Sequence, residues 1–356
     1  MKKCAIITIS NSNYGNRLQN YALQYFLQSN NYYVETIKNV NFLNKRKNKF
    51  NYFLRRIAYL FKKSDFKDGW KREKNFKRFN KRIKFSKKVF SWNNYSWMKE
   101  YDYFIVGSDQ VWNPQFRLTE FDLCAFSEKK KIISFAASIG VTKLDDNDIY
   151  KIKKYLTGIK AISVRENEGA KLLEQILPNQ NIVTLLDPTL LLNDIEWESI
   201  ETKPNFVIPK KFILCYFLGG MNENTINFVN NYARIHKLQI INLLDKKSLY
   251  YECGPSEFLY LERNADIIFT DSFHSIVFSI IFKKNFIVFD RIEKQHDCIN
   301  SRISTILKKF NLEDRVYCSN FDPYKIDNID YKNLNVEGIV KDEKEKSLLF
   351  IINNTK

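Results

Sequence analysis

One segment gathers hydroxyl, carboxylate and imidazole groups at the end of a predicted buried strand. The apolar run 266–270 ends at Thr270, and Asp271, Ser272 and His274 follow where an apolar helical pattern begins. A helix N-terminus favours a bound phosphate or carboxylate, and an imidazole exchanges protons near neutral pH. A single histidine is more often structural, but this strand-to-helix position favours function. We predict that His274 is catalytic, as an acid or a phosphate contact, and that Thr270 and Ser272 bind substrate.

Segment 13–20, Asn-Tyr-Gly-Asn-Arg-Leu-Gln-Asn, is a glycine- and amide-rich turn that opens a helix after the first apolar run. Glycine lets backbone N–H groups approach an anion, and the helix N-terminus adds its dipole. The segment lacks the full glycine motif of dinucleotide-binding proteins, so an ordinary turn is the alternative interpretation. Gly15, Asn16 and Gln19 are the predicted ligand contacts in this turn.

Segment 107–114, Gly-Ser-Asp-Gln-Val-Trp-Asn-Pro, follows another apolar run. Its small and polar residues, closing on Trp and Pro, indicate a shaped loop at a strand end. We expect Asp109 to be the carboxylate most exposed to a cleft, where it can take a proton from a hydroxyl group. Capping a turn is the alternative role for Asp109. Ser108 and Trp112 are predicted to bind substrate beside it.

Two arginines occupy comparable positions. Arg165 directly follows the apolar run 161–164, and Arg302 opens a helical pattern after Asn300 and Ser301. A guanidinium group makes bidentate contacts with carboxylates and phosphates. We predict that both arginines hold an anionic substrate, and a surface ion pair is the alternative for either one.

The elements that must position these residues alternate between apolar strand-like runs and helical patterns, as parallel β-α-β units do. Predicted strands cover 4–9, 32–37, 103–106, 132–136, 161–164 and 182–186, and then 212–217, 239–243, 266–270 and 286–289. Predicted helices include 16–28, 224–236, 256–264, 274–282 and 301–310. Asp187-Pro188 and the stretch 201–205 are interpreted as a linker between the two groups. The fold class is therefore α/β, with two doubly wound Rossmann-like domains facing a cleft, where ligands bind beyond the strand ends.

The predicted domains are 1–195, with a basic helical insertion at 45–90, and 206–335, followed by a C-terminal helix at 336–356. The chain has 356 residues, which fits two domains. Hydrophobic residues make up 44%, which excludes a globally disordered chain. No window approaches 18 consecutive apolar residues, so we expect no transmembrane helix.

The positive charge is concentrated in one segment. The chain carries a formal charge of +17, and residues 45–88 hold 19 Lys and Arg against three acidic residues. Aromatic and aliphatic residues at helical spacing interleave with these charges, which predicts two basic amphipathic helices. Such helices suit an anionic membrane surface. Packing of their apolar face on the domain is an equally weighted alternative, and no nucleic-acid recognition motif accompanies the charge, so we expect no nucleic-acid partner.

The six cysteines and three histidines show no metal-ligand spacing, so no metal site is predicted. Scattered cysteines of this kind are expected to be reduced and mostly buried, as in a cytoplasmic protein. The N-terminal segment MKKCAIITIS is interpreted as a first buried strand and not as a cleaved signal.

Taken together, these motifs resemble the bacterial polysaccharide pyruvyl transferase family. The resemblance runs from residue 3 to about 315, skips the basic segment, and lies in 13–16, 19–23, 106–113, 134–138, 163–166, 187–190, 270–274 and 300–303. It implies a GT-B-like fold and transfer of the enolpyruvyl unit of phosphoenolpyruvate to sugar hydroxyls, with a pyruvate ketal formed and phosphate released. Phosphoenolpyruvate is then the donor substrate, and no cofactor is implied.

By this resemblance His274 matches the donor-site histidine, and Arg165 matches an arginine that holds the donor. The domain 206–335 is then the donor side and 1–195 the acceptor side. Many family members carry arginine two positions before the histidine, where this chain has Ser272. We hypothesise that Arg302 supplies the missing charge.

The resemblance places the expected enzyme in the cytoplasm, peripheral at the inner face of the membrane, where residues 45–88 contact lipid and the glycan acceptor is held on a lipid carrier. Two alternatives stay open from the sequence. One is a GT-B glycosyltransferase that uses a nucleotide sugar in the same pathway. The other is a non-catalytic protein that binds anionic surfaces through its basic segment.

Overall fold

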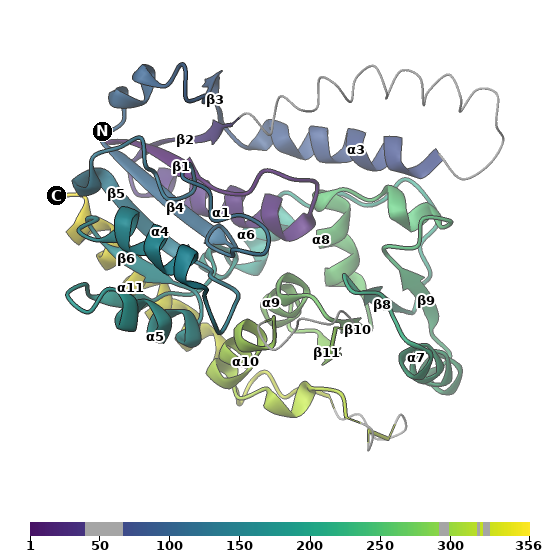
Figure 1. The fold of residues 1–356 in the computed structure, drawn as a ribbon. Coiled ribbons are helices and arrows are strands. Elements are labelled where there is room, and N and C mark those ends of the chain that lie inside the picture. The colour runs from purple at the N-terminus through teal and green to yellow at the C-terminus, as the bar shows by residue number, and fades with distance from the viewer. Residues whose placement is uncertain (40–66, 292–298, 319–320, 323–327) are drawn as a thin grey trace.

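The structure, a computed structural model, describes residues 1–39, 67–291, 299–318, 321–322 and 328–356, and these form two parallel β-sheets (Figure 1). The first sheet has the order β3-β2-β1-β4-β5-β6-β7, with β1 (Lys3–Ile7), β2 (Tyr33–Lys38), β3 (Phe85–Val89), β4 (Tyr103–Asp109), β5 (Ile132–Ala137), β6 (Ile162–Val164) and β7 (Ile182–Thr184). The second has the order β11-β10-β8-β9, with β8 (Phe212–Tyr216), β9 (Gln239–Asn242), β10 (Ile267–Thr270) and β11 (Asn285–Val288).

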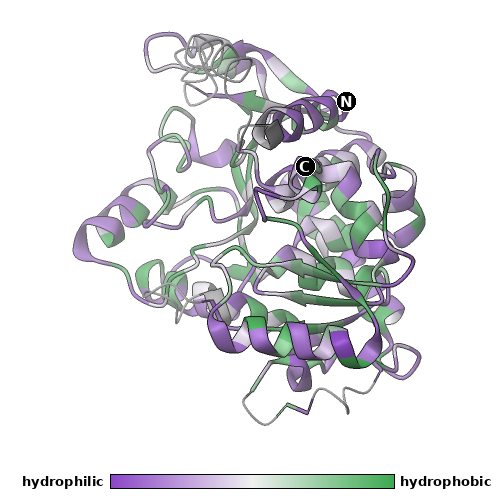
Figure 2. Cartoon of the chain, turned by 90° about the vertical axis from the view of Figure 1, so that its right-hand side faces the viewer, coloured by the Kyte–Doolittle hydropathy of each residue, from purple (hydrophilic) through white to green (hydrophobic). Residues whose placement is uncertain are grey.

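Helices connect and cover these strands. They are α1 (Tyr14–Ser29), α3 (Lys67–Phe79), α4 (Asp146–Leu156), α5 (Asn167–Ile176), α6 (Asp194–Glu198), α7 (Glu223–His236), α8 (Pro255–Asn264), α9 (Phe273–Ile281), α10 (Ile299–Phe310) and α11 (Val336–Asn354). Short 3-10 turns, among them η5 (Pro188–Leu191) and η6 (Leu249–Glu252), complete the described part of the chain. Figure 2 shows mostly hydrophobic strands beside helices with both hydrophobic and hydrophilic stretches.

Alternate residues of each strand pack on opposite faces of its sheet, because side chains along a strand have a period of two. In the second sheet, Leu214 and Ile268 pack with α8 and α9, whereas Ile213 and Phe269 pack with α7. The first sheet is likewise covered by α1 on one face and by α4 and α5 on the other. The predicted fold class, an α/β protein with two doubly wound parallel sheets, is confirmed.

Each of the ten predicted strands corresponds to an observed strand, but β3 was not predicted. Its sequence, Phe-Ser-Lys-Lys-Val, is charged because β3 is the edge of the first sheet, where lysine is common on an exposed strand. The predicted helical insertion at 45–90 is therefore wrong at its C-terminal end. Residues 40–66, including the first of its two predicted helices, lie outside the described residues.

Helix α3 is the described part of the basic segment, and its apolar face packs on the protein. Phe76 and Phe79 are buried, and the Phe76 ring stacks on Tyr14 of α1 at 5.3 Å between centroids. Its polar side chains reach the second sheet's connections, since Asn75 Nδ2 donates to the Glu252 carbonyl at 2.9 Å. Arg72 lies over the Tyr14 ring, 4.3 Å from its centroid. For α3, packing on the domain is therefore the observed role of the apolar face.

The C-terminal helix returns to the first sheet. Lys346 of α11 donates to the Thr184 carbonyl at 2.8 Å, and Thr355 shares a hydrogen bond of 2.6 Å with Tyr32. Figure 1 shows both termini on the side of the molecule where the first sheet lies. The domain boundaries at residues 195 and 206 stay predictions.

Candidate active site

Three polar residues lie at or after the ends of strands β4, β6 and β7 of the first sheet, and the second sheet supplies a fourth. Asp109 ends β4, Arg165 follows β6 and Asp187 follows β7, so all three lie at the carboxyl edge of parallel strands. His274 lies in the first turn of α9, after β10 of the second sheet. Because α9 contacts η5, the imidazole meets the carboxyl edge of the first sheet.

Asp187 is the centre of the cluster, and its side chain is completely buried. Its Oδ2 accepts a hydrogen bond from Arg165 Nη1 at 2.6 Å and lies 3.1 Å from the Ser108 hydroxyl. Its Oδ1 accepts from the backbone N–H and the hydroxyl of Thr189, at 3.0 and 2.7 Å. Burial alone would raise the pKa of Asp187, but His274 and Arg165 hold it well below its usual value. The carboxylate is therefore charged and fixed.

The His274 ring lies between this carboxylate and helix α1. Its Nε2 is 3.7 Å from Asp187 Oδ2, and its side chain is 8% exposed. On the other side, a β-carbon added at Gly15 would lie 2.0 Å from His274 Nδ1. Gly15 was predicted to bring backbone N–H groups to an anion. The structure gives it another role, because its missing side chain makes room for the imidazole.

We expect Gly15→Ala to displace His274 and to lower kcat by roughly 10²-fold, the usual effect of about 1 Å of misplacement in a catalytic geometry. Turnover with saturating substrates measures this loss. Gly69→Ala is the matched control, because a β-carbon at Gly69 in α3 has no neighbour within 4 Å. Equal turnover of the two variants would show that the Gly15 contact does not hold the histidine in place.

Arg165 is buried and contacts two carboxylates and one aromatic ring. Besides Asp187, its Nη2 lies 3.4 Å from Asp109 Oδ1, and its guanidinium carbon is 4.4 Å from the centroid of Phe273. Burial alone would lower the pKa of Arg165, but Asp187, Asp109 and Glu166 together raise it. Arg165 therefore remains a fixed positive charge, held in position by its neighbours.

Two further arginines are buried in the same region. Arg17 is 1% exposed and Arg302 is 5% exposed. Burial lowers the pKa of each to about 10, while the carboxylate of Asp109 acts in the opposite direction on both and Arg165 lowers that of Arg302 further. Both guanidinium groups therefore stay charged at neutral pH.

The three buried arginines keep unused donors. Among the described residues, the Nε atoms of Arg17, Arg165 and Arg302 are buried without a hydrogen-bond partner. A buried donor without a partner carries a desolvation cost that an anion can remove. The site thus combines positive charge and free N–H groups, which suits a carboxylate or phosphate ligand.

The structure brings the predicted residues His274, Asp109, Arg165, Arg302 and Gly15 into one cluster. The predicted exposure of Asp109 is wrong, because the residue is 5% exposed and faces Arg165. Its φ of 71° lies in the left-handed region at the end of β4, where the chain turns back. Whether Asp109 acts as a base stays a prediction.

Several predicted substrate-binding residues form hydrogen bonds within the protein interior. Trp112 is completely buried and its Nε1 donates to the Asp122 carbonyl, and its contact with a ligand stays a prediction. Thr270 is also completely buried and donates to the Tyr216 carbonyl, and its contact with substrate likewise stays a prediction. A sequence pattern marks strand ends but does not show which side chains turn inward.

Gln19 and Ser108 are hydrogen-bonded to each other inside the fold, next to the cluster. The Ser108 N–H donates to Gln19 Oε1 at 3.1 Å, and Gln19 Nε2 donates to Thr8. Both residues are completely buried and help to position Asp187 and the strand ends, and their contact with substrate stays a prediction.

The remaining predicted contacts are not settled. The backbone N–H of Asn16 donates to the side chain of Asn13, which caps α1, so this donor is already used. Ser272 caps α9 without a side-chain hydrogen bond to the helix. Substrate contacts of Asn16 and Ser272 stay predictions.

Asp187 and Arg17 were missed as site residues. Asp187 was interpreted as part of a linker, but η5, which it caps, is buried in the cluster. A carboxylate at a strand end, followed by Pro and Thr, was the available signal. Arg17 carried no signal of its own, because the burial of a helical arginine depends on what packs against the helix.

Arg165 is among the residues that line a pocket of about 550 Å³. Lys308 and Lys309 of α10 and Lys346 of α11 contribute to its wall, together with Glu343, which pairs with Lys309. The lining also includes the carboxylate of Asp342, and it includes none of His274, Asp109 and Asp187. No group of three or more His, Cys, Asp or Glu side chains that could hold a metal ion is found in the part of the chain that the structure describes.

Comparison with known proteins identifies one family. The family model described as polysaccharide pyruvyl transferase matches residues 13–292. None of the curated proteins searched matches the chain.

Solved structures similar to the chain include two kinds of enzyme. They are MurG of Acinetobacter baumannii (10% identity, 98% of this chain and 94% of that chain, TM-score 0.40), UDP-GlcNAc 2-epimerase of Methanocaldococcus jannaschii (13%, 96% and 99%, 0.44) and UDP-GlcNAc 2-epimerase of Neisseria meningitidis bound to UDP-GlcNAc (10%, 98% and 94%, 0.44). At these identities and TM-scores they give no information on substrate.

Proposed function

Because the chain belongs to the polysaccharide pyruvyl transferase family and is therefore a transferase, we propose that it moves the enolpyruvyl unit of phosphoenolpyruvate onto sugar hydroxyls. The acceptor is a bacterial surface polysaccharide or its lipid-linked precursor. The observation that carries the proposal is the contact of Arg165 with Asp187, beside His274, together with two further buried arginines near Asp109 and unused Nε donors on all three.

The donor fits this arrangement chemically. Phosphoenolpyruvate carries a carboxylate and a phosphate, and both are ligands that guanidinium groups bind with paired hydrogen bonds. The pocket that Arg165 lines also carries Lys308, Lys309 and Lys346, which supports binding of an anion nearby. After the reaction, the same cationic groups can bind the inorganic phosphate until it is released.

The proposed reaction needs two kinds of proton transfer. A proton adds to the methylene carbon of phosphoenolpyruvate, and positive charge develops at the neighbouring carbon. Two hydroxyl oxygens of the sugar form bonds to that carbon, and its bond to the phosphate oxygen breaks. Of the two hydroxyl protons released, one replaces the proton delivered to the methylene group and one leaves with phosphate. The products are a pyruvate ketal and inorganic phosphate.

We assign the acid role to His274, with Asp187 as its positioning residue. A carboxylate beside an imidazole orients the ring. Asp109 is the proposed base for the sugar hydroxyl, although its pairing with Arg165 means that it also holds that arginine.

Arg302 is proposed to bind the donor in place of the arginine that Ser272 replaces. We expect Arg302→Ala to raise the KM for phosphoenolpyruvate by about 10- to 100-fold, the range for loss of a hydrogen bond to a charged group. Steady-state phosphate release at varied donor concentration measures this change. Arg82→Ala, at an exposed position outside the site, is the control. An unchanged KM would remove Arg302 from the donor site.

The function is tested by incubating the protein with phosphoenolpyruvate, labelled in its pyruvyl carbons, and candidate glycans. Release of phosphate together with label in the glycan is the expected result. Consumption of a nucleotide sugar, with no turnover of phosphoenolpyruvate by any acceptor, would instead identify a glycosyltransferase and overturn the proposal.

We further propose that the enzyme works in the cytoplasm at the inner face of the membrane, through the basic segment 45–88. In its described part, Trp70 is 41% exposed and Lys74 is exposed, which is chemistry suited to a lipid headgroup region. None of the described helices is long and apolar enough to cross a membrane. Co-sedimentation with phosphatidylglycerol vesicles but not with phosphatidylcholine vesicles is the expected result, and equal sedimentation with both would contradict it.

A further inference from the structure

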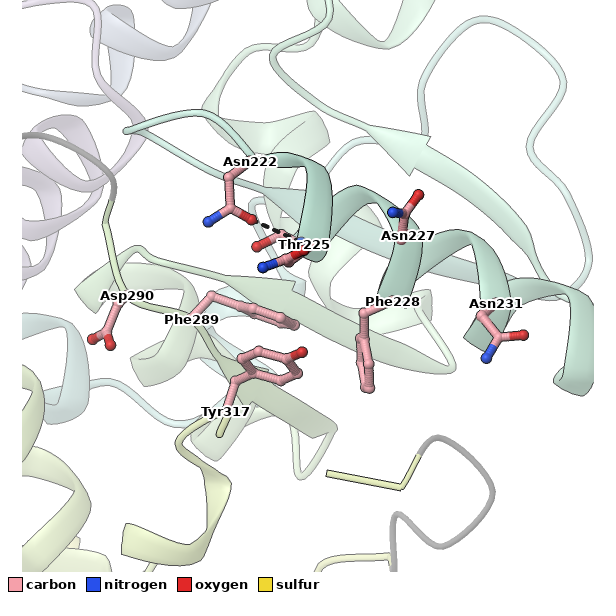
Figure 3. Close-up of a pocket in the computed structure, with 9 residues that line it drawn as sticks. Asn222, Thr225, Asn227, Phe228, Asn231, Phe289, Asp290 and Tyr317 are labelled. Carbon is pink, nitrogen blue, oxygen red and sulfur yellow. Dashed lines mark hydrogen bonds between the residues drawn. The ribbon is translucent and has the colours of Figure 1, made fainter. Parts of the chain in front are cut away.

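A second pocket, of about 720 Å³, lies on the face of the second sheet that α7 covers (Figure 3). His274 and α9 belong to the opposite face of the same sheet. The pocket includes Phe289 and Asp290, which directly follow β11, and side chains from the first three turns of α7. It is thus separate from the cluster around Asp187 but lies at a carboxyl edge, where open parallel sheets bind ligands.

One wall of this pocket is made of asparagine side chains. Five of the ten residues in 222–231 are asparagine, and four of the five line the pocket. Asn224, Asn227 and Asn231 are spaced by three and four residues, so they share one side of α7. Within the described residues, the amides of Asn224 and Asn227 make no hydrogen bond, and Asn222 uses only its oxygen, to cap the helix.

The asparagines lower the stability of helix α7, which indicates that their side chains have a role other than forming the helix. Asparagine is a poorer helix former than the lysine or glutamate that commonly occupy exposed helical positions. Each amide offers both donors and an acceptor. A row of such groups complements a ligand whose own groups both donate and accept, as hydroxyl groups do.

An aromatic surface lies next to the amides. The half-buried ring of Tyr317 stacks on Phe289 with centroids 4.6 Å apart and packs edge-on against Phe228 at 4.9 Å. In the described structure its hydroxyl makes no hydrogen bond, and Figure 3 shows it directed along the pocket. An apolar ring beside amide groups fits the mixed apolar and hydroxyl faces of a sugar ring.

The charges of the pocket disfavour an anionic ligand. Its described lining residues include neither lysine nor arginine, and Glu223 occupies the first turn of α7. The nearby Arg291 is already engaged, since its Nε donates to Asp271 at 3.1 Å. A nucleotide or a phosphate therefore finds less favourable charge here than at Arg165.

From these observations we infer that the pocket binds an uncharged sugar residue of the acceptor glycan, distant from the sugar that receives the pyruvyl group. This inference rests on the proposed function for its substrate class. Arg291 follows Asp290 of the pocket and donates hydrogen bonds to Asp271. Asp271 lies three residues before His274, so a short run of bonded residues connects the pocket with the candidate active site. An acceptor several residues long contacts both, whereas a single sugar contacts only the active site.

Binding is tested without the donor by saturation-transfer NMR, using neutral tetrasaccharides of glucose, galactose, N-acetylglucosamine and N-acetylmannosamine. We expect at least one to bind, and to bind about 10- to 30-fold more weakly to the double variant Asn224→Ala/Asn227→Ala, the loss of two neutral hydrogen bonds. Alanine favours the helix more than asparagine does, so a loss of binding does not arise from unfolding. Asn230→Ala is the matched control, because Asn230 is exposed on α7 but does not line the pocket.

Two results would overturn the inference. One is that no tetrasaccharide binds, and the other is that the double variant binds as Asn230→Ala does. Displacement of a bound tetrasaccharide by UDP would also contradict it, by showing a nucleotide site. These binding measurements do not require pyruvyl transfer. If phosphoenolpyruvate is not turned over, the proposed function is rejected, and the binding measurements still show whether the pocket binds a sugar.

Where transfer is observed, the double variant is expected to raise the KM for a long acceptor about 10-fold or more. The KM for a disaccharide acceptor and for phosphoenolpyruvate should stay unchanged. An equal rise for both acceptor lengths would contradict a subsite distant from the reacting sugar.

Discussion

His274→Ala is expected to lower kcat for phosphate release by about 10²- to 10⁴-fold, the range for removal of a general acid. The imidazole is the one titratable group that α9 presents to the buried carboxylate of Asp187, which also binds Arg165. Turnover under saturating donor and acceptor measures the loss. His236→Ala, at the exposed C-terminus of α7, is the control that should retain wild-type turnover.

A glutamine at the same position separates the two roles proposed for His274. Glutamine can donate a hydrogen bond to phosphate but cannot deliver a proton at neutral pH. If the residue is the acid, His274→Gln should be as slow as His274→Ala. Substantial recovery by glutamine would restrict the residue to phosphate binding, and full activity of the alanine variant would remove it from the reaction.

Arg165→Met is expected to reduce the free energy of unfolding by about 3–5 kcal/mol, because it leaves the Asp187 carboxylate buried without its main partner. The Arg165 side chain is 2% exposed and that of Asp187 is fully buried, so water cannot replace the lost contact. Chemical denaturation at neutral pH measures the change. A loss below about 1 kcal/mol would indicate a pair no stronger than an exposed ion pair.

Two comparisons identify the unpaired charge as the cause. Arg165→Met combined with Asp187→Asn removes both charges, so it should be more stable than Arg165→Met alone. The pH dependence has a definite sign. In the wild type the pKa of Asp187 is lowered, so its contribution is fully present above about pH 4 and is lost as the pH falls. In Arg165→Met the carboxyl group gains stability by protonation, so the difference between wild type and variant should shrink on acidification.

Much of the fold could be predicted because its elements have local signals. Strands such as β1, β8 and β10 are buried on both faces, and they therefore appear as short continuous apolar runs. The start of α9 was placed within one residue by the change from polar to apolar helical spacing. Strand β3 lacked this signal, because an edge strand is exposed and carries lysine.

The candidate site was predicted only in part, for a different reason. The positions of His274 and Arg165 follow from strand ends, since parallel strands carry their carboxyl ends to one edge. The sequence contains no comparable sign that Trp112 turns inward or that Gly15 faces the imidazole, because both depend on the element packed opposite.

From the sequence alone came the α/β class, the order of its strands along the chain, the family resemblance, and the concentration of positive charge in residues 45–88. These are determined by local periodicity and composition. Only the tertiary structure decided which charges are partners. Asp187, taken for part of a linker, became the buried centre of the cluster because η5 packs against α9 and α1. Burial strengthens the electrostatic interactions of a charged group, and it lowers the stability of the fold when such a group has no partner. Which groups are buried depends on packing between segments that are distant in the sequence.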